Sequence, residues 1–417
     1  MPAEPQYGSV PFTEAIDHFK SKLNLSTPYW DAIDGQTHAK AFTVAGATKL
    51  DLLSDLRQAA EDAITNGTTI TEFRKQFDKA VAKHGWSYNG KRGWRTRVIY
   101  DTNLRTAHAA GAWQQAQETN DSRPYLQYMT AGDGRVRPQH AAWDEKVFPI
   151  DSPWWNTHYP PNGWGCRCTT RTLSQRQMES EGLTVSEPPP LEPTERINVK
   201  NGEVYGEVPK GIDPGWDYNV GKAWLAPDIA FGEKIMQMPE SMRRAALDGT
   251  KDLVPYLQQQ FSPWANSLLD RKQALGEVRT VGYLSNEVAD GMMARGVMPS
   301  TAVITVTDRD IMHALRPDKS VLDKAVPPDM VRALPDLITS PEAVLWDKNN
   351  PGLLYVFSVP GDTRHGKFVV KVNYAIKARG VDNRRHSVVT NTVRTGTMVP
   401  LASLKNTGLY EVLSGKL

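Results

Sequence analysis

The chain has 417 residues and a mass of 46.5 kDa, with 40% hydrophobic and 23% charged residues. These values are typical of a soluble globular protein with two or three domains. No apolar run approaches the ~20 residues of a membrane span, and the first residues lack the basic and apolar regions of a signal peptide. A formal net charge of +2 makes a general DNA-binding protein an unattractive hypothesis.

The charge is unevenly distributed along the chain. Residues 83–176 carry 13 Lys and Arg against 7 Asp and Glu, residues 184–270 carry 8 against 13, and residues 271–417 carry 20 against 14. Two basic regions therefore flank an acidic one. Contact with nucleic acid or with an acidic protein surface is one interpretation, and a solvated surface is the other.

Residues 11–85 have the apolar periodicity of helices. We expect N-caps at Thr13 and Thr71 and a helix end at Gly85, which suits the left-handed conformation of a C-cap. The apolar positions that define two of these helices are Leu50, Leu53, Leu56 and Ala60, then Phe73, Phe77 and Val81. This region is predicted to be a helical scaffold.

Residues 94–118 form the longest predicted helix. One side is apolar, whereas polar residues recur at steps of three and four on another. The polar positions are Arg97, Asp101, Arg105 and His108. They face either a charged neighbour or solvent.

Residues 125–172, called the motif region below, are unusually rich in Trp, Pro and Gly and contain both cysteines. YLQYM (125–129) alternates like a half-buried strand, and AGDGR (131–135) supplies a tight turn. Pro138 is suited to open a short helix that carries His140 and Trp143. The density of Pro and Gly after that helix predicts irregular structure.

Cys166 and Cys168 are separated by one residue. A disulfide between them would be strained, so two interpretations remain: a buried pair of free thiols or a shared soft metal ion. A zinc site needs two more ligands, for which His140 and His158 are the candidates, with Asp133 as a substitute. Such a zinc would be structural, and no other cofactor is predicted.

No enzyme motif accompanies these residues. The chain lacks an HExxH zinc motif and a Gly-rich phosphate loop that ends in Gly-Lys-Ser/Thr. The motif region therefore favours a structural and docking role.

The spacing of Asp133, Arg135, Arg137 and His140, followed by PPNGWGCRC (160–168), resembles the signature of the phage Mu protein F-like family of minor head proteins. Segments upstream and downstream extend the resemblance over residues 30–225. The resemblance gives structural roles to the three motif residues before His140 and also to Pro161 and Arg167. It further implies that Arg105 bonds Asp133 or Asp144.

Membership would imply a minor capsid protein that takes part in head morphogenesis of a tailed bacteriophage. Its partners would be the portal protein, the scaffold or the major capsid protein, with phage DNA as a further contact. It would act in the host cytoplasm during assembly and then reside in the head or neck of the virion.

Beyond the motif region, EPPPLEPT (187–194) predicts an extended linker, and Asn201-Gly202 predicts the turn of a hairpin. DPGWDYNVGKAW (213–224) carries Trp216, Tyr218 and Trp224. These aromatic residues either anchor a partner or fold back on the first domain. Residues 227–275 are predicted to form connecting helices.

The C-terminal part has strand-like segments. VITVT (303–307) precedes a helix with His313, and four strand candidates follow between residues 341 and 396. This order predicts a separate α+β domain with an antiparallel sheet.

The same order resembles the nuclease-like toxin modules of the barnase, EndoU, colicin and RelE type. The resemblance implies His313 as general acid–base, and cations and hydroxyls that contact the scissile phosphate of RNA. Those contact candidates are Lys371, Arg384, Arg394, Thr390 and Thr392. The alternative is that His313 packs within its helix and the cations are surface residues. A delivery module fused to a metal-independent nuclease is accordingly the competing function.

The predicted fold class is α+β. Residues 1–90 are helical, and residues 91–186 form the core with the motif region. Residues 187–275 contain linker, hairpin and connecting helices, and residues 276–417 form the C-terminal domain.

Overall fold

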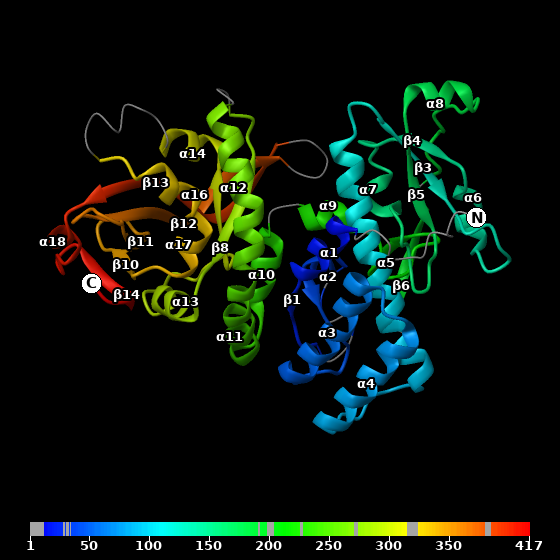
Figure 1. The fold of residues 1–417 in the computed structure, drawn as a ribbon, viewed down its shortest axis with the longest axis horizontal. Coiled ribbons are helices and arrows are strands. Elements are labelled where there is room, and N and C mark those ends of the chain that lie inside the picture. The colour runs from blue at the N-terminus through cyan, green and yellow to red at the C-terminus, as the bar shows by residue number, and fades with distance from the viewer. Residues whose placement is uncertain are drawn as a thin grey trace, which may run out of the picture. The chain divides into compact units, whose positions relative to one another are not determined.

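The computed structural model describes residues 12–27, 30, 33, 35–190, 192–197, 204–225, 228–270, 274–314, 324–379 and 385–417. The chain divides into unit 1, Met1–Ala226, and unit 2, Pro227–Leu417 (Figure 1). A helical first part and a sheet-rich second unit confirm the predicted α+β class. Across the described ranges, no helix has the length and apolar character that crossing a membrane requires.

Helices build the first part of unit 1. Two short strands, β1 (Leu23–Asn24) and β2 (Ala41–Phe42), pair in parallel beside them. The helices are α1 (Thr13–Lys20), α2 (Gly35–Lys40), α3 (Leu50–Asn66), α4 (Ile70–His84) and α5 (Arg92–Glu118). The scaffold predicted for residues 11–85 and the long helix after it are therefore present.

The ends of these helices confirm one of the predicted helix boundaries and contradict two of the predicted caps. Gly85 ends α4 with φ of 59°, as predicted. The predicted cap Thr71 is wrong, because the Thr69 hydroxyl accepts from the Glu72 amide and the Glu72 carboxylate accepts from the Thr69 amide. Thr13 is also not a cap, since it is the first residue of α1 after Phe12.

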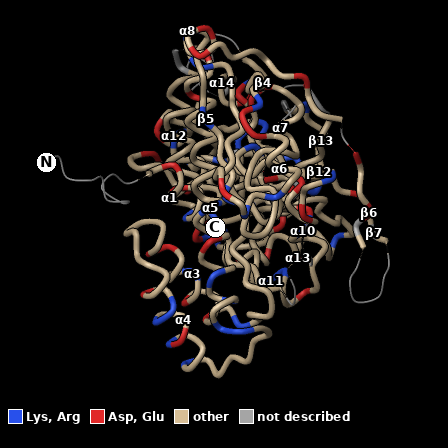
Figure 2. Tube along the Cα trace, turned by 90° about the vertical axis from the view of Figure 1, so that its right-hand side faces the viewer, with Lys and Arg blue, Asp and Glu red and all other residues tan. Residues whose placement is uncertain are grey.

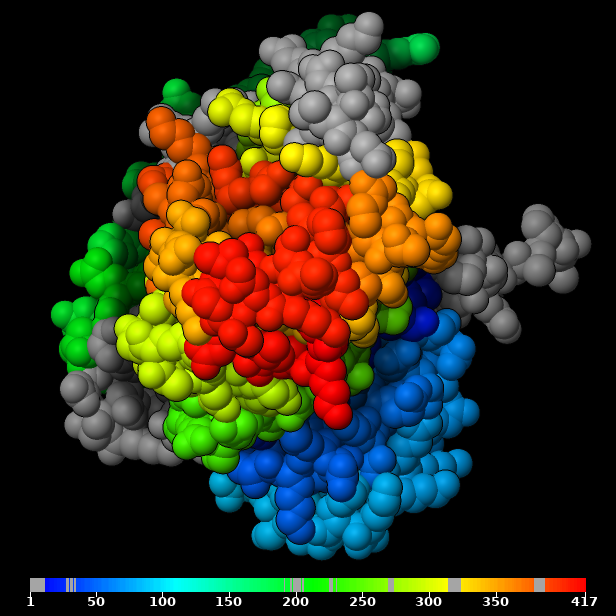
Figure 3. Space-filling model, turned by 90° about the vertical axis from the view of Figure 1, so that its left-hand side faces the viewer, coloured from blue at the N-terminus to red at the C-terminus, as the bar shows by residue number. Residues whose placement is uncertain are grey.

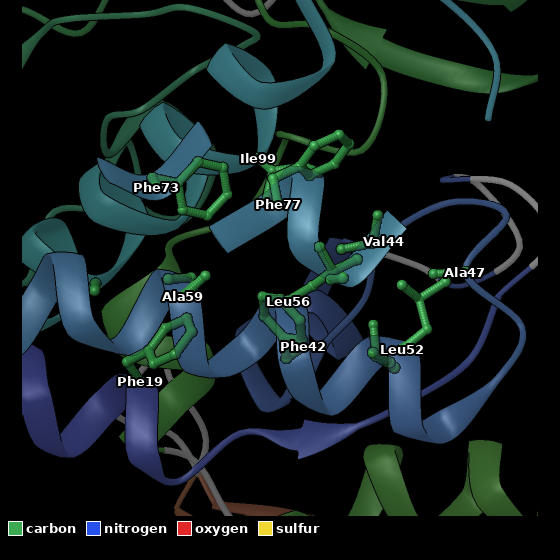
Figure 4. Packing of buried hydrophobic residues seen from close by; sticks show 14 of the residues in the cluster. Phe19, Phe42, Val44, Ala47, Leu52, Leu56, Ala59, Phe73, Phe77 and Ile99 are labelled. Carbon is green, nitrogen blue, oxygen red and sulfur yellow. The ribbon is translucent and has the colours of Figure 1, made fainter. Parts of the chain in front are cut away.

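The core of unit 1 lies between α1, α3, α4 and α5 (Figure 4). Its aromatic residues come from three separate parts of the chain: Phe19, Phe42, Phe73 and Phe77 are all fully buried. Leu53, Leu56 and Ala60 are buried as predicted, whereas Leu50 at the helix start is 41% exposed. A core of this kind holds α5 in place, and α5 leads directly into the motif region.

The motif region contains a small antiparallel sheet with strand order β4-β3-β5. The predicted strand is β3 and the predicted short helix is α6. Its elements are β3 (Tyr125–Met129), α6 (Pro138–Trp143), β4 (Val147–Pro149), α7 (Trp155–His158) and β5 (Thr169–Leu173), and α8 (Gln175–Ser180) follows the region. The peptide bond between Pro160 and Pro161 is cis.

Two strands and one helix follow in unit 1. β6 (Pro193–Ile197) and β7 (Val204–Pro209) form the predicted hairpin, although Asn201-Gly202 lies outside the described residues. Trp216 and Trp224 are each 3% exposed, and Trp224 lies on α9 (Val220–Leu225). Both indoles therefore fold back into unit 1, which decides between the two interpretations of this segment.

Unit 2 is built on a seven-stranded sheet of order β14-β10-β11-β12-β13-β9-β8. Neighbours are antiparallel except β13 and β9, which are parallel because the chain returns through several elements between them. The strands are β8 (Val278–Tyr283), β9 (Val303–Thr307), β10 (Ala343–Asp347), β11 (Leu353–Ser358), β12 (His365–Arg379), β13 (Arg385–Val399) and β14 (Tyr410–Gly415). The two edge strands, β8 and β14, were not predicted.

Helices pack against this sheet from several parts of unit 2. α12 and α17 contact β8, α14 contacts β13, and α13 contacts β14; Figure 3 shows the face formed by the C-terminal residues. The helices are α10 (Ile229–Gln237), α11 (Glu240–Gly249), α12 (Val254–Asp270), α13 (Asn286–Met293), α14 (Asp308–Ala314), α16 (Pro328–Arg332), α17 (Leu334–Thr339) and α18 (Leu401–Leu404), with a 3-10 turn at Thr250–Leu253. Residues 229–270 thus contribute helices to unit 2.

The assigned cap of α4 can be tested with two nearby threonines. Thr69→Ala removes the side chain that accepts from the Glu72 amide, so we expect it to lower the free energy of unfolding by about 1 kcal/mol. Thr71→Ala changes an exposed position inside the helix and should change stability by less than about 0.5 kcal/mol. Urea denaturation of both variants measures the difference; a larger loss in Thr71→Ala would contradict this assignment.

Candidate functional site

The turn after β3 is held by an arginine from the far end of the motif region. Arg167 donates to both carboxylate oxygens of Asp133, with an Nη1–Oδ2 distance of 2.8 Å. Asp133 also accepts from the Arg135 amide and side chain. These bonds, first of all the one from Arg167, hold the pKa of the Asp133 carboxyl well below its usual range. Arg135 itself is 80% exposed.

A second arginine joins three segments of unit 1. Arg137 forms a bidentate pair with Asp213, at 2.8 and 2.9 Å, and donates to the Trp164 carbonyl at 3.0 Å. Asp213 also accepts from the Trp164 amide. A Cβ at Gly163 would lie 2.3 Å from the Asp213 carboxylate, so the chain needs glycine there. The N-cap residue of α6, the Pro-rich loop and the segment after β7 are therefore tied together.

The prediction that Arg105 bonds Asp133 or Asp144 is wrong. Its guanidinium donates to the Cys166 carbonyl at 2.8 Å and pairs with Asp101 on its own helix at 3.4 Å. Asp133 is bound by Arg167, while Asp144 accepts from the Thr130 amide and hydroxyl. α5 therefore contacts the cysteine loop through a backbone carbonyl.

The described structure brings His140, Cys166 and Cys168 together. The His140 Nδ1 atom lies 3.7 Å from the Cys166 sulfur and 3.6 Å from the Cys168 sulfur, and all three ligand atoms lie within 4.8 Å of one another. α6 places His140, while Gly165, with φ of 69°, turns the loop so that both cysteines reach it. His140 and Cys166 are buried, and Cys168 is half-buried.

The second ring nitrogen of His140 has its own partner. Nε2 lies 2.9 Å from the Gly211 carbonyl, to which an N–H must donate. Nδ1 is therefore left as the acceptor that faces both sulfurs. Gly211 is 71 residues away from His140 in the chain, so this tautomer is fixed by tertiary structure.

The two thiols affect each other's ionisation. A hydrogen bond from Cys168 lowers the pKa of the Cys166 thiol, and burial opposes this shift. The same bond and burial raise the pKa of Cys168 far above its usual range. The two pKa shifts have opposite directions, so one thiol of the pair ionises more readily than the other.

The other two ligand candidates lie elsewhere. His158 stacks on Trp154 at 4.6 Å, packs edge-on against Trp143, and its Nδ1 lies 2.8 Å from the Thr157 hydroxyl. Asp133 is engaged by the two arginines described above. Neither belongs to the group around His140.

Aromatic rings and one buried hydrogen-bonded pair pack beside the group, where Trp143 stacks on His140 at 5.0 Å. Tyr128 is fully buried and donates to Asn162 at 2.8 Å. Asn162, Gly211 and Asp213 were not predicted from the sequence. A buried Asn between Pro161 and Gly163 had no local signal, whereas Asp213 within DPGWD was an unpaired acidic residue beside a predicted docking loop. The aromatic rings that pack with Tyr128 in this cluster are those of Trp143, Phe148, Trp154 and Trp155.

The residues suggested for nuclease chemistry are placed as follows. Arg394 pairs with the buried Asp310 at 3.2 Å. His313, which is exposed on α14, interacts electrostatically with the same carboxylate. Lys371 lies opposite Thr392 in the β12–β13 register.

The remaining nuclease candidates are the two threonines and Arg384. Thr390 and Thr392 are both 0% exposed, and the Thr390 hydroxyl lies 3.5 Å from the Val303 carbonyl. In this structure, both hydroxyls are therefore shielded from a substrate in solvent. Arg384 lies outside the described residues.

The chain therefore forms two units. In the first unit a helical scaffold is followed by the motif region, whose loops are held by arginine side chains. A family described as Phage Mu protein F like protein matches residues 54–171. The chain is 32% identical to the putative capsid assembly protein F of Escherichia phage Mu, over 97% of this chain and 96% of that protein. It is 28% identical to the Mu-like prophage FluMu F protein of Haemophilus influenzae, over 80% and 87%.

The chain therefore belongs to the phage Mu protein F-like family, as its motif spacing indicated. The similarity extends beyond residues 30–225 into unit 2. No solved structure matches the chain.

The Arg137–Asp213 pair should contribute more than an exposed pair does. We expect Arg137→Ala and Asp213→Ala each to lower the free energy of unfolding by about 1–2 kcal/mol, and the double variant to cost about 1 kcal/mol less than the sum. The Arg92–Asp78 pair, in which both side chains are nearly half exposed, is the matched control and should couple by less than about 0.5 kcal/mol. Tryptophan fluorescence is a suitable probe because 10 of the 12 tryptophans lie in unit 1. Equal coupling energies in the two pairs would contradict the conclusion that Arg137 and Asp213 hold these segments together.

His158 should make unit 1 sensitive to mild acid. Burial lowers the pKa of His158 from its ordinary value of 6.5 to about 4. Between these two pH values the unfolded chain binds the proton more readily, so stability must fall as the pH decreases. We expect His158→Gln to flatten the stability–pH curve between pH 6.5 and 4, as measured by urea denaturation at a series of pH values. An unchanged slope would show that His158 is not buried in its neutral form.

Proposed function

We propose that this protein is a minor capsid protein that takes part in assembling the head of a tailed bacteriophage. The observation that carries the proposal is the near end-to-end similarity to the putative capsid assembly protein F of phage Mu. A match that covers almost all of both chains supports the same overall role better than a match to one shared domain does.

The same coverage favours a head-assembly role for unit 2. An aligned span of 97% of the chain must include most of residues 227–417, so this unit has a counterpart in the Mu protein. A nuclease delivered as an added cargo would instead be expected to lie outside such a match. The buried hydroxyls of Thr390 and Thr392 point the same way.

We favour protein partners over DNA, because the net charge of the chain is only +2. Both signs of charge occur along α4 (Figure 2), where Glu72 and Asp78 lie among four basic residues, Arg74, Lys75, Lys79 and Lys83. We place the contacts on the portal, scaffold or major capsid protein, during assembly in the host cytoplasm and later in the head or neck of the virion.

The first turn of α5 is the contact surface that we favour on unit 1. Trp94 is 58% exposed there and sits among the cations of KRGWRTR (91–97). Exposed tryptophan with neighbouring arginine is the composition of an interface hot spot. An acidic surface of a head protein would complement it.

Deleting the gene in the phage or prophage that encodes this chain tests the proposed function. We expect the lysates to lose DNA-filled heads, and a plasmid copy of the gene to restore them. Electron microscopy counts the heads, and mass spectrometry of purified heads or procapsids detects the protein. Normal numbers of filled heads without the gene would refute the proposal.

The contact surface has its own test in the same complementation assay. Trp94→Ala should reduce the amount of the protein that copurifies with heads several-fold while leaving its thermal stability unchanged. Val185→Ala, which truncates another exposed apolar side chain of unit 1, is the control and should copurify normally. Equal copurification of both variants would place the contact elsewhere.

A further inference from the structure

The group formed by His140, Cys166 and Cys168 has the chemistry of a metal site. Thiolate sulfur and neutral imidazole nitrogen are the preferred zinc ligands in proteins. In a tetrahedral site, zinc lies about 2.3 Å from sulfur and about 2.0–2.1 Å from nitrogen, which sets the sulfur and nitrogen atoms about 3.6 Å apart. The two sulfur–nitrogen distances here are 3.6 and 3.7 Å.

The surroundings of His140 fit the same interpretation. A histidine that binds a metal through one ring nitrogen usually donates its other N–H to a carbonyl or a carboxylate. The Nε2 atom of His140 has this partner in the Gly211 carbonyl, at 2.9 Å. In the neutral ring, Nδ1 is then the nitrogen with the free lone pair, and it faces the two sulfurs.

Charge balance also favours a divalent cation. Two thiolates and one neutral imidazole carry a charge of −2 when both thiols are ionised, and Zn²⁺ would neutralise it. A buried charge that is not neutralised is costly, and a bound cation removes that cost.

We propose that His140 Nδ1, Cys166 Sγ and Cys168 Sγ bind one zinc ion, with water completing the tetrahedron. The role of the ion is to cross-link. It ties α6 to the loop that leads into β5, and through the Gly211 carbonyl it orients the segment after β7. Arg137 and Asp213 join the same three segments, so the ion and the ion pair reinforce each other.

Zinc content of the purified full chain tests the site, independently of any role in head assembly. The protein is produced with added zinc, dialysed, and analysed for metal. We expect about one zinc ion per chain, and a loss of more than about ten-fold in zinc affinity for Cys166→Ser, Cys168→Ser and His140→Gln. His158→Gln is the matched control: it changes a nearby buried histidine outside the group and should retain the zinc.

Two measurements on the unmodified protein keep the proposal testable where a variant fails to fold. X-ray absorption at the zinc edge should show two sulfur and two nitrogen or oxygen ligands. Both thiols should react slowly with a thiol reagent until a chelator is added. The proposal is overturned if the reconstituted protein holds no zinc, if the zinc has only nitrogen and oxygen ligands, or if His158→Gln loses zinc as the cysteine variants do.

Discussion

The loop between α7 and β5, residues 159–168, contains no helix or strand, so side chains must hold its course. Three arginines supply that support. Arg167 binds Asp133, Arg137 binds Asp213, and Arg105 donates to the Cys166 carbonyl. Charged donors with bidentate geometry are suited to this task, since they fix orientation as well as distance. The cysteines reach His140 only because these contacts set the course of the loop.

The helical scaffold and the motif region depend on each other through α5. Its apolar side is buried with the phenylalanine core, and Trp113 packs edge-on against Tyr159 of the loop at 4.9 Å. Gly221 on α9 would place a Cβ 2.2 Å from Trp113, so glycine permits a close approach there. A continuous packed path therefore runs from the core of unit 1 to its motif region.

Local patterns in the sequence predicted local structure well. Phe73 and Phe77 marked a buried stripe, Gly85 a helix end, and Pro138 the start of the helix that carries His140. The cap was misplaced although a signal existed, because Thr69 and Glu72 have the spacing of a capping box and Thr71 lacks it.

Partners far apart in the chain were harder to predict. Gly211 for His140 and Asp213 for Arg137 lie more than 70 residues away, and nothing in the local pattern links them. Edge strand β14 was missed because its residues are largely exposed and show no clean alternation. The family, by contrast, was recognised from the motif spacing together with the segments on either side of it, since such a pattern can be recognised without knowledge of what the residues contact.

Hydrogen exchange of the full chain, followed by mass spectrometry, tests most directly whether side chains hold the loop and the segment after β7 as one unit. We expect amides in residues 160–168 and 211–216 to be protected, and both segments to lose protection together in Arg137→Ala while α3 and α4 keep theirs. Rapid exchange of these segments in the unmodified protein, or independent changes in the variant, would contradict this expectation.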